Sequence, residues 1–122
     1  MADEIETNAK AALLYAENAN IDATIELDEA INNIKAMSYL AIYYAYKIRG
    51  AIQFRAGENE KAMISLGDAY CWWMDYSNLM DELYTGMEMA RTKDLPDWHV
   101  HDESVLREYT DLGGTGIPLC KE

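Results

Sequence analysis

A polar stripe along residues 58–92 constrains the fold more than any other feature of the sequence. Polar side chains recur there at spacings of three, four and seven residues, the period of an α-helix. The stripe consists of Lys61, Ser65, Asp68, Asp75, Asn78, Glu82 and Thr85. Apolar residues fill most of the remaining circumference, so this helix must pack between neighbours. The stripe therefore predicts a helical bundle.

The same periodicity predicts the other helices and, with turn-forming residues, their ends. Helices are predicted at residues 3–18, 25–55, 58–92 and 102–111. Asp22 or Thr24 should cap the second helix, and Gly57 should end it, because glycine readily adopts the left-handed backbone conformation found after many helices. Asp102 should cap the last helix and Gly113 should end it. The short turn after Gly57 makes the two longest helices an antiparallel hairpin.

These elements predict an all-α fold: an antiparallel bundle of three long helices plus a short C-terminal helix, without a sheet. Residues 1–114 would form the bundle domain and residues 115–122 a C-terminal tail. A chain of 122 residues suits one hydrophobic core. The expected core consists of Leu13, Ile31, Ile34, Ala41, Ala45, Ile48, Leu66, Trp73, Met80, Leu83 and Met87.

The charge of the chain excludes two classes of partner. Ten Lys and Arg stand against 22 Asp and Glu, for a net charge of -12. Binding to nucleic-acid backbones or to anionic membrane surfaces requires a basic patch, so neither partner is expected. No apolar run reaches the roughly 18 residues of a membrane-spanning helix.

Two cysteines are too few for a disulfide framework. Cys71 lies in the third predicted helix, and Cys120 lies near the C-terminus. A bridge between them would require the tail to fold back. We favour two free thiols, one on the helix surface and one in a loose tail.

His99 and His101, with Asp97 nearby, form the only combination of histidine and carboxylate that suggests a metal site. Two histidines two residues apart point to one side of an extended strand and could share a metal ion. No third distant ligand is indicated, so we expect both to pack and cap a connector, and we expect neither a metal nor another cofactor.

The acidic residues of the third helix mostly fall on or beside its polar stripe. Asp75, Asp81, Glu82 and Glu88 are therefore interpreted as a solvated face rather than as an acid–base pair. With no activated nucleophile either, the isolated chain is not expected to be an enzyme. The alternative is a small metal-dependent enzyme that uses His99 and His101.

Tyrosine is unusually frequent, with nine Tyr against one Phe. Tyrosine combines an apolar ring with a polar tip, which suits a boundary between protein and water. We expect a contact surface for another domain or subunit, formed by Tyr39, Tyr43, Tyr46, Trp72 and Trp98. The alternative is a sugar- or peptide-binding platform. We favour docking because binding sites are concave and a helix flank is not.

Arg49 lies in a largely apolar stretch of the second helix, with Ala45 at the preceding turn. A guanidinium in such surroundings usually forms charge-assisted hydrogen bonds with a carboxylate. We therefore predict a structural ion pair across the bundle, with Asp75 or Glu82 as candidate partners.

Two successive segments carry a resemblance to a known family. The residues concerned are Met37, Tyr39-Leu40-Ala41, Tyr43-Tyr44-Ala45, Lys47 and Ile48-Arg49-Gly50, then Ala69, Trp73, Tyr76, Tyr84, Arg91 and Asp97-Trp98-His99. Residues 5–114 resemble the C-terminal helical region of large bacterial carbohydrate-active, glycosidase-like proteins. The resemblance implies a non-catalytic accessory module of a multi-domain carbohydrate-processing protein, in which a separate domain would be the glycoside hydrolase. It implies an extracellular or periplasmic location if the parent protein is secreted, and it carries over no catalytic residue.

Overall fold

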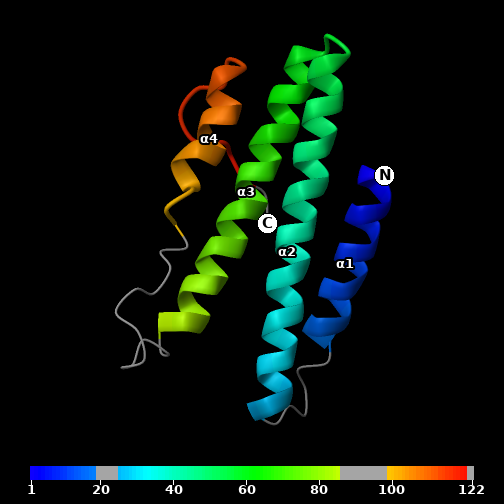
Figure 1. The fold of residues 1–122 in the computed structure, drawn as a ribbon, viewed down its shortest axis with the longest axis vertical. Helices are drawn as coiled ribbons and strands as arrows, with labels where there is room; N and C mark the ends of the chain where they lie inside the picture. The colour runs from blue at the N-terminus through cyan, green and yellow to red at the C-terminus, as the bar shows by residue number, and fades with distance from the viewer. Residues whose placement is uncertain (19–24, 86–98, 121–122) are drawn as a thin grey trace.

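The computed structural model describes residues 1–18, 25–85 and 99–120 of the chain. Within these residues the backbone forms α-helices and no strand. The helices are α1 (Ala2–Asn18), α2 (Ile25–Arg55), α3 (Asn59–Thr85) and α4 (Asp102–Asp111) (Figure 1). The predicted all-α bundle of three long helices and one short one is confirmed.

Local sequence signals placed the ends of α2 and α4 correctly. Gly57 follows α2 with a φ of 82°, and Gly113 follows α4 with a φ of 105°, both in the left-handed region that favours glycine. The described part of α3 ends at Thr85, so residues 86–92 of the predicted helix lie outside the described residues. The cap candidates Asp22 and Thr24 lie outside them as well.

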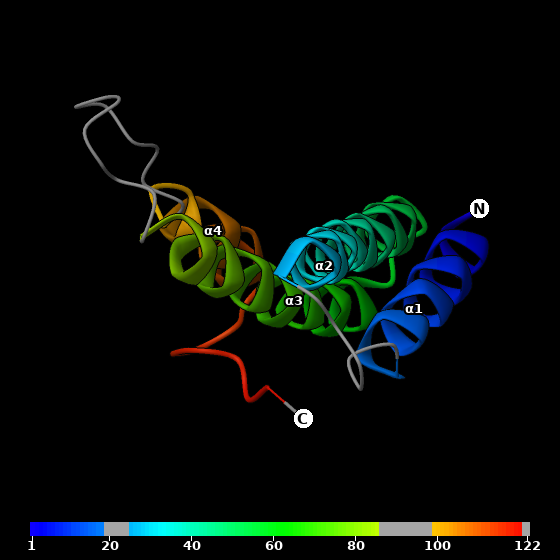
Figure 2. The ribbon, with the colours of Figure 1, turned by 90° about the horizontal axis from the view of Figure 1, so that it is seen from below.

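The central helix is α2, which packs against α1 on one side and against α3 on the other. Helix α4 packs against α3, and Figure 2 shows α1 and α4 on opposite sides of the α2–α3 pair. Among the described residues, no Cα atom of α1 lies within 8 Å of a Cα atom of α3. The bundle is therefore open between these two helices.

Small residues permit a close approach of α2 and α3. Ala45 and Ala62 are completely buried, and Ala69 is 2% exposed. Gly50 is buried too, and a Cβ atom there would lie 3.0 Å from the Leu66 side chain. Such a contact is tighter than ordinary packing, so Gly50 serves the helix–helix contact rather than a turn.

The predicted core is correct in part. Ile31 and Ala45 are buried, whereas the other predicted positions with a described side chain are half-buried, apart from Ile34. Ile34 is 45% exposed, so its placement in the core is wrong. It lies in a shallow apolar trough between α1 and α2 that α1 only partly covers. Ile42 is fully buried instead, so the buried face of α2 includes a position absent from the predicted core, and Met87 lies outside the described residues.

Arg49 forms the predicted ion pair across the bundle, but with different partners. Its Nη2 atom lies 2.6 Å from Asp3 Oδ1 and 2.8 Å from Glu6 Oε1, both on α1. The proposed partners Asp75 and Glu82 are wrong, because Arg49 lies on the side of α2 that faces α1. Tyr46 adds a hydrogen bond, since its hydroxyl donates to Glu6 Oε2 at 2.9 Å. This network ties α1 to α2.

The network predicts a loss of stability in acid. Burial alone would raise the pKa of the Glu6 carboxyl, but hydrogen bonds from Lys10, Arg49 and Tyr46 outweigh burial and lower this pKa from 4.5 to about 2. A carboxyl with a depressed folded-state pKa stabilises the fold above its unfolded-state pKa and loses that contribution as the pH falls. With solvent screening included, we expect Glu6 to contribute about 1–2 kcal/mol at neutral pH.

Urea denaturation between pH 6 and about pH 2 measures this contribution. The free energy of unfolding of Glu6→Gln should vary less with pH than that of the wild type across this window. Glu4→Gln, at an exposed position on the same helix, is the matched control and should keep the wild-type dependence. Identical pH profiles for Glu6→Gln and the wild type would contradict the assignment.

Candidate functional site

A groove of about 990 Å³ lies between α1 and α3, and residues of α2 also line it. Helices α1, α2 and α3 all contribute to its walls, and the C-terminal segment closes one side. Its lining consists of Leu13, Tyr39, Tyr46, Ile64, Asp68, Cys71, Trp72, Asp75, Leu119 and Cys120. Concave sites with aromatic walls and a few polar groups are typical ligand or partner sites, so this groove is the candidate functional site.

Aromatic rings from two helices face this groove. Tyr39 and Tyr46 are two turns apart on α2 and therefore share one face of it. The Tyr39 ring packs against Trp72 of α3, with 6.0 Å between centroids and a tilt of 39°. All three rings are half-buried, so each keeps some surface for a further contact. The predicted contact residues Tyr39, Tyr46 and Trp72 thus lie together.

The prediction is wrong for Tyr43. Its side chain is only 4% exposed and belongs to the core, where its ring lies 5.2 Å from that of Trp73. Its hydroxyl accepts a hydrogen bond from Lys47 Nζ at 3.3 Å, and burial raises the pKa of this phenol. Tyr43 therefore belongs to the packing of α2 on α3, and Trp98 lies outside the described residues.

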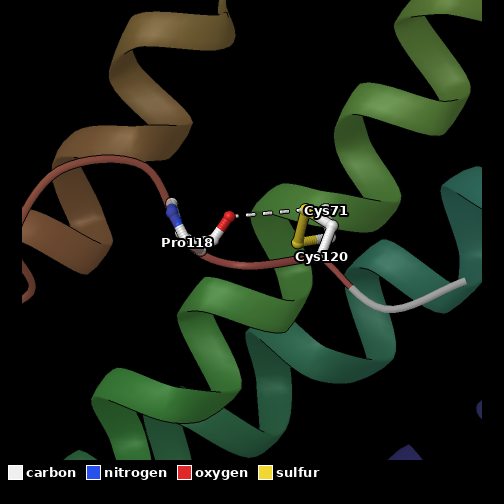
Figure 3. Close-up of a disulfide and its surroundings, with 3 residues drawn as sticks. All are labelled: Cys71, Pro118 and Cys120. Atoms are coloured by element: carbon white, nitrogen blue, oxygen red, sulfur yellow. Dashed lines mark hydrogen bonds between the residues drawn. A yellow bond between two sulfur atoms is a disulfide. The ribbon is translucent and has the colours of Figure 1, made fainter.

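The C-terminal segment folds back on α3, and a disulfide joins Cys120 to Cys71 (Figure 3). The two Cα atoms are 5.4 Å apart, so the prediction of two free thiols is wrong. Cys120 Sγ also lies 3.7 Å from the carbonyl oxygen of Pro118. A disulfide sulfur carries no proton, so this approach is a contact rather than a hydrogen bond.

Gly67 was the overlooked sequence signal for this arrangement. A Cβ atom at this position on α3 would lie 3.1 Å from the Tyr109 ring and 3.4 Å from Pro118. The missing side chain lets α4 and the returning segment approach the same patch of α3. Pro118 is buried as a result, and Leu119 and Cys120 reach the groove.

Two carboxylates line the groove. Partial desolvation raises the pKa of Asp75, although the residue is exposed, and no ion pair of Asp75 occurs among the residues that the structure describes. The pKa of the neighbouring Tyr39 is raised by burial first and then by the negative charge of Asp75. Asp68, one helical turn before Trp72, adds a second acidic group. The groove is therefore aromatic and acidic.

Asp102 holds α4 against α3 and is not the predicted cap. His101 occupies the N-cap position, without a side-chain hydrogen bond to the helix. One carboxylate oxygen of Asp102 accepts a hydrogen bond from Trp73 Nε1 at 2.7 Å, and the other lies 2.7 Å from His99 Nδ1. The carboxylate thus links Trp73 of α3 to His99 in the turn before α4. Both of its oxygens are engaged there, so it does not cap the backbone N–H groups of α4.

The structure places the metal candidates in a turn rather than in a strand. His99 contacts Asp102, the ring of His101 lies 6.4 Å from that of Trp73, and Asp97 lies outside the described residues. No group of three potential metal ligands occurs within residues 1–18, 25–85 and 99–120. Asp75, Asp81 and Glu82 are exposed, as expected for a solvated face, and Glu88 is not among the described residues.

Comparison with protein-family models, curated proteins and solved structures finds no match to this chain. The resemblance to carbohydrate-active proteins therefore stays an expectation from sequence. None of the helices in the described part of the chain combines the length and the apolarity that crossing a bilayer requires.

Proposed function

We propose that this chain is a non-catalytic helical accessory module that docks on another domain or subunit through the groove between α1 and α3. The observation that carries the proposal is the gathering of Tyr39, Tyr46 and Trp72, half-buried, in one concave site. Tyr and Trp are enriched at protein interfaces, and large residues in pockets supply most of the binding energy there.

The chemistry of the groove supports a binding role. Its two thiols are joined in a disulfide, which leaves no thiolate to act as a nucleophile. Among the described residues of the lining, no histidine, serine or threonine lies beside the carboxylates of Asp68 and Asp75. Such a site can hold a partner but offers no acid–base pair matched to a nucleophile.

The proposed context is a multi-domain carbohydrate-processing protein, on the strength of the sequence resemblance. A disulfide persists in oxidising compartments such as the bacterial periplasm or the extracellular space. The Cys71–Cys120 bridge therefore supports an extracellular or periplasmic location for the module.

Carbohydrate binding in the same groove is the second candidate function. The flank of a single helix is not concave, but Tyr39 of α2 and Trp72 of α3 together lie in a concave site. Aromatic faces can cover the apolar side of a sugar ring, and carboxylates accept hydrogen bonds from hydroxyl groups.

Substitution of Trp72 tests docking. The partner would be the polypeptide encoded next to this chain in the source genome, and its affinity is measured by calorimetry. We expect Trp72→Ser to weaken binding by at least about tenfold, as for a buried interface anchor. Tyr44→Ser is the control, because Tyr44 is 49% exposed but outside the groove. Equal effects of both substitutions would refute docking through the groove.

A titration with neutral oligosaccharides, followed by tryptophan fluorescence, tests the second candidate. Trp72 lines the groove and should report a ligand there. Saturable binding below millimolar concentration that is lost in Tyr39→Ser would favour carbohydrate binding over docking.

A further inference from the structure

The groove combines aromatic faces with carboxylates, and this combination selects for positive charge. The negative face of an aromatic ring attracts a cation within about 6 Å of its centroid, and a carboxylate adds a charge-assisted hydrogen bond. Trp72, Tyr39 and Asp75 supply both kinds of group from adjacent turns of α2 and α3.

The chain already uses this chemistry at the border of the groove. The Arg49 guanidinium lies 4.9 Å from the centroid of the Tyr46 ring and also pairs with Glu6. Tyr46 itself lines the groove. One aromatic ring and its neighbouring carboxylate thus hold a guanidinium that comes from the chain itself.

The Tyr39–Trp72 pair has no guanidinium of the chain against it in the described residues. Lys10 Nζ lies 5.8 Å from the centroid of the Trp72 ring, but it is held on α1 by Glu6 at 2.7 Å. In the described part of the chain, no Lys or Arg lines the groove itself, and no ion pair of Asp75 occurs there; the Asp75 residue is exposed and so open to an incoming cation. A carboxylate beside aromatic rings attracts an incoming cation and can pair with a guanidinium through charge-assisted hydrogen bonds.

We propose that the groove receives an arginine side chain of the protein partner, with its guanidinium against the Tyr39–Trp72 pair and hydrogen-bonded to Asp75. This inference rests on the proposed docking function and names the chemistry of the partner. The net charge of -12 favours a partner segment of opposite charge. Leu13, Ile64 and Leu119 give the groove aliphatic walls, so apolar residues should flank the arginine.

Arginine fits this site better than lysine does. Its planar guanidinium stacks on aromatic rings and presents two parallel N–H donors to a carboxylate, whereas an ammonium ion is a point charge with strong hydration. The Arg49 arrangement beside the groove has the same three components: a guanidinium, a tyrosine ring and carboxylates.

A pair of peptides that differ only in charge tests the proposal. The probe is acetyl-Gly-Leu-Arg-Leu-Gly-amide, and its control carries citrulline, which is neutral and nearly isosteric, in place of arginine. Binding to the full chain is followed by tryptophan fluorescence at low ionic strength. We expect the arginine peptide to bind about tenfold more tightly than the citrulline peptide.

Two variants test whether Asp75 causes the preference for the arginine peptide over the citrulline peptide. Asp75→Asn should remove most of the preference for the arginine peptide over the citrulline peptide, and the Tyr39–Trp72 rings should retain the smaller remainder. Glu82→Gln, at an exposed position on the same helix and outside the groove, removes the same charge from the protein and should leave the preference intact. Equal losses in the two variants would show a general charge effect and overturn the assignment to Asp75.

Other outcomes separate this inference from the docking function. Equal affinity for the two peptides, lost in Trp72→Ser, would overturn arginine recognition while leaving docking in the groove supported. Absence of binding by both peptides would also overturn arginine recognition, and the partner experiment with Trp72→Ser would then decide docking independently.

Discussion

Removal of the Cys71–Cys120 disulfide should lower the free energy of unfolding by about 2–4 kcal/mol. The bridge joins residues separated by 49 positions, so in the unfolded chain it closes a long loop and reduces conformational entropy. The melting temperature should fall by roughly 10 °C. Thermal denaturation of Cys71→Ser and Cys120→Ser, followed by circular dichroism, measures the effect.

The controls exploit the fact that either substitution breaks the same bond. Cys71→Ser, Cys120→Ser and the double variant should lose similar amounts of stability. Added reductant should destabilise the wild type alone. If the three variants unfold at the wild-type temperature, the bridge does not constrain the unfolded chain and the prediction fails.

Replacement of Tyr43 by alanine should cost about 3–4 kcal/mol of folding stability. The side chain is 4% exposed, and its ring packs against Trp73 at the contact between α2 and α3. Truncation would leave a cavity and would remove the hydroxyl that accepts a hydrogen bond from Lys47. Urea denaturation followed by circular dichroism measures the loss.

Tyr39 and a conservative substitution provide the comparison. Tyr43→Phe keeps the ring and should cost about 1 kcal/mol, since only the hydrogen bond is lost. Tyr39→Ala should cost about 1 kcal/mol or less, because this half-buried ring faces the groove. Similar destabilisation by Tyr39→Ala and Tyr43→Ala would show that the two tyrosines do not differ in role.

The contrast between these tyrosines shows where sequence periodicity stops being sufficient. Residues four apart on a helix lie about 40° apart around its axis, so both fall on nearly the same face. Whether one is buried depends on where the neighbouring helices lie. Helix α3 covers Tyr43, whereas the separation of the α1 and α3 backbones, which have no Cα pair within 8 Å in the described residues, leaves Tyr39 at the groove.

Arg49 shows that the sequence predicts the kind of ion-pair partner but not its identity. Its apolar surroundings were enough to predict a carboxylate partner, because a guanidinium withdrawn from water requires one. The choice of Asp3 and Glu6 over Asp75 and Glu82 follows from the direction in which Arg49 points, toward α1. That direction is a property of how α1 lies on α2.

The sequence by itself determined the helices, most of their described ends and the bundle class. These depend on interactions within a few residues: the helical period, and glycine after α2 and α4. Only the tertiary structure decided the groove, the disulfide and the partners of Arg49 and Asp102. Each of these joins residues that lie far apart in sequence or on different helices, and their meeting depends on how helices pack on α2 and α3 rather than on local preference.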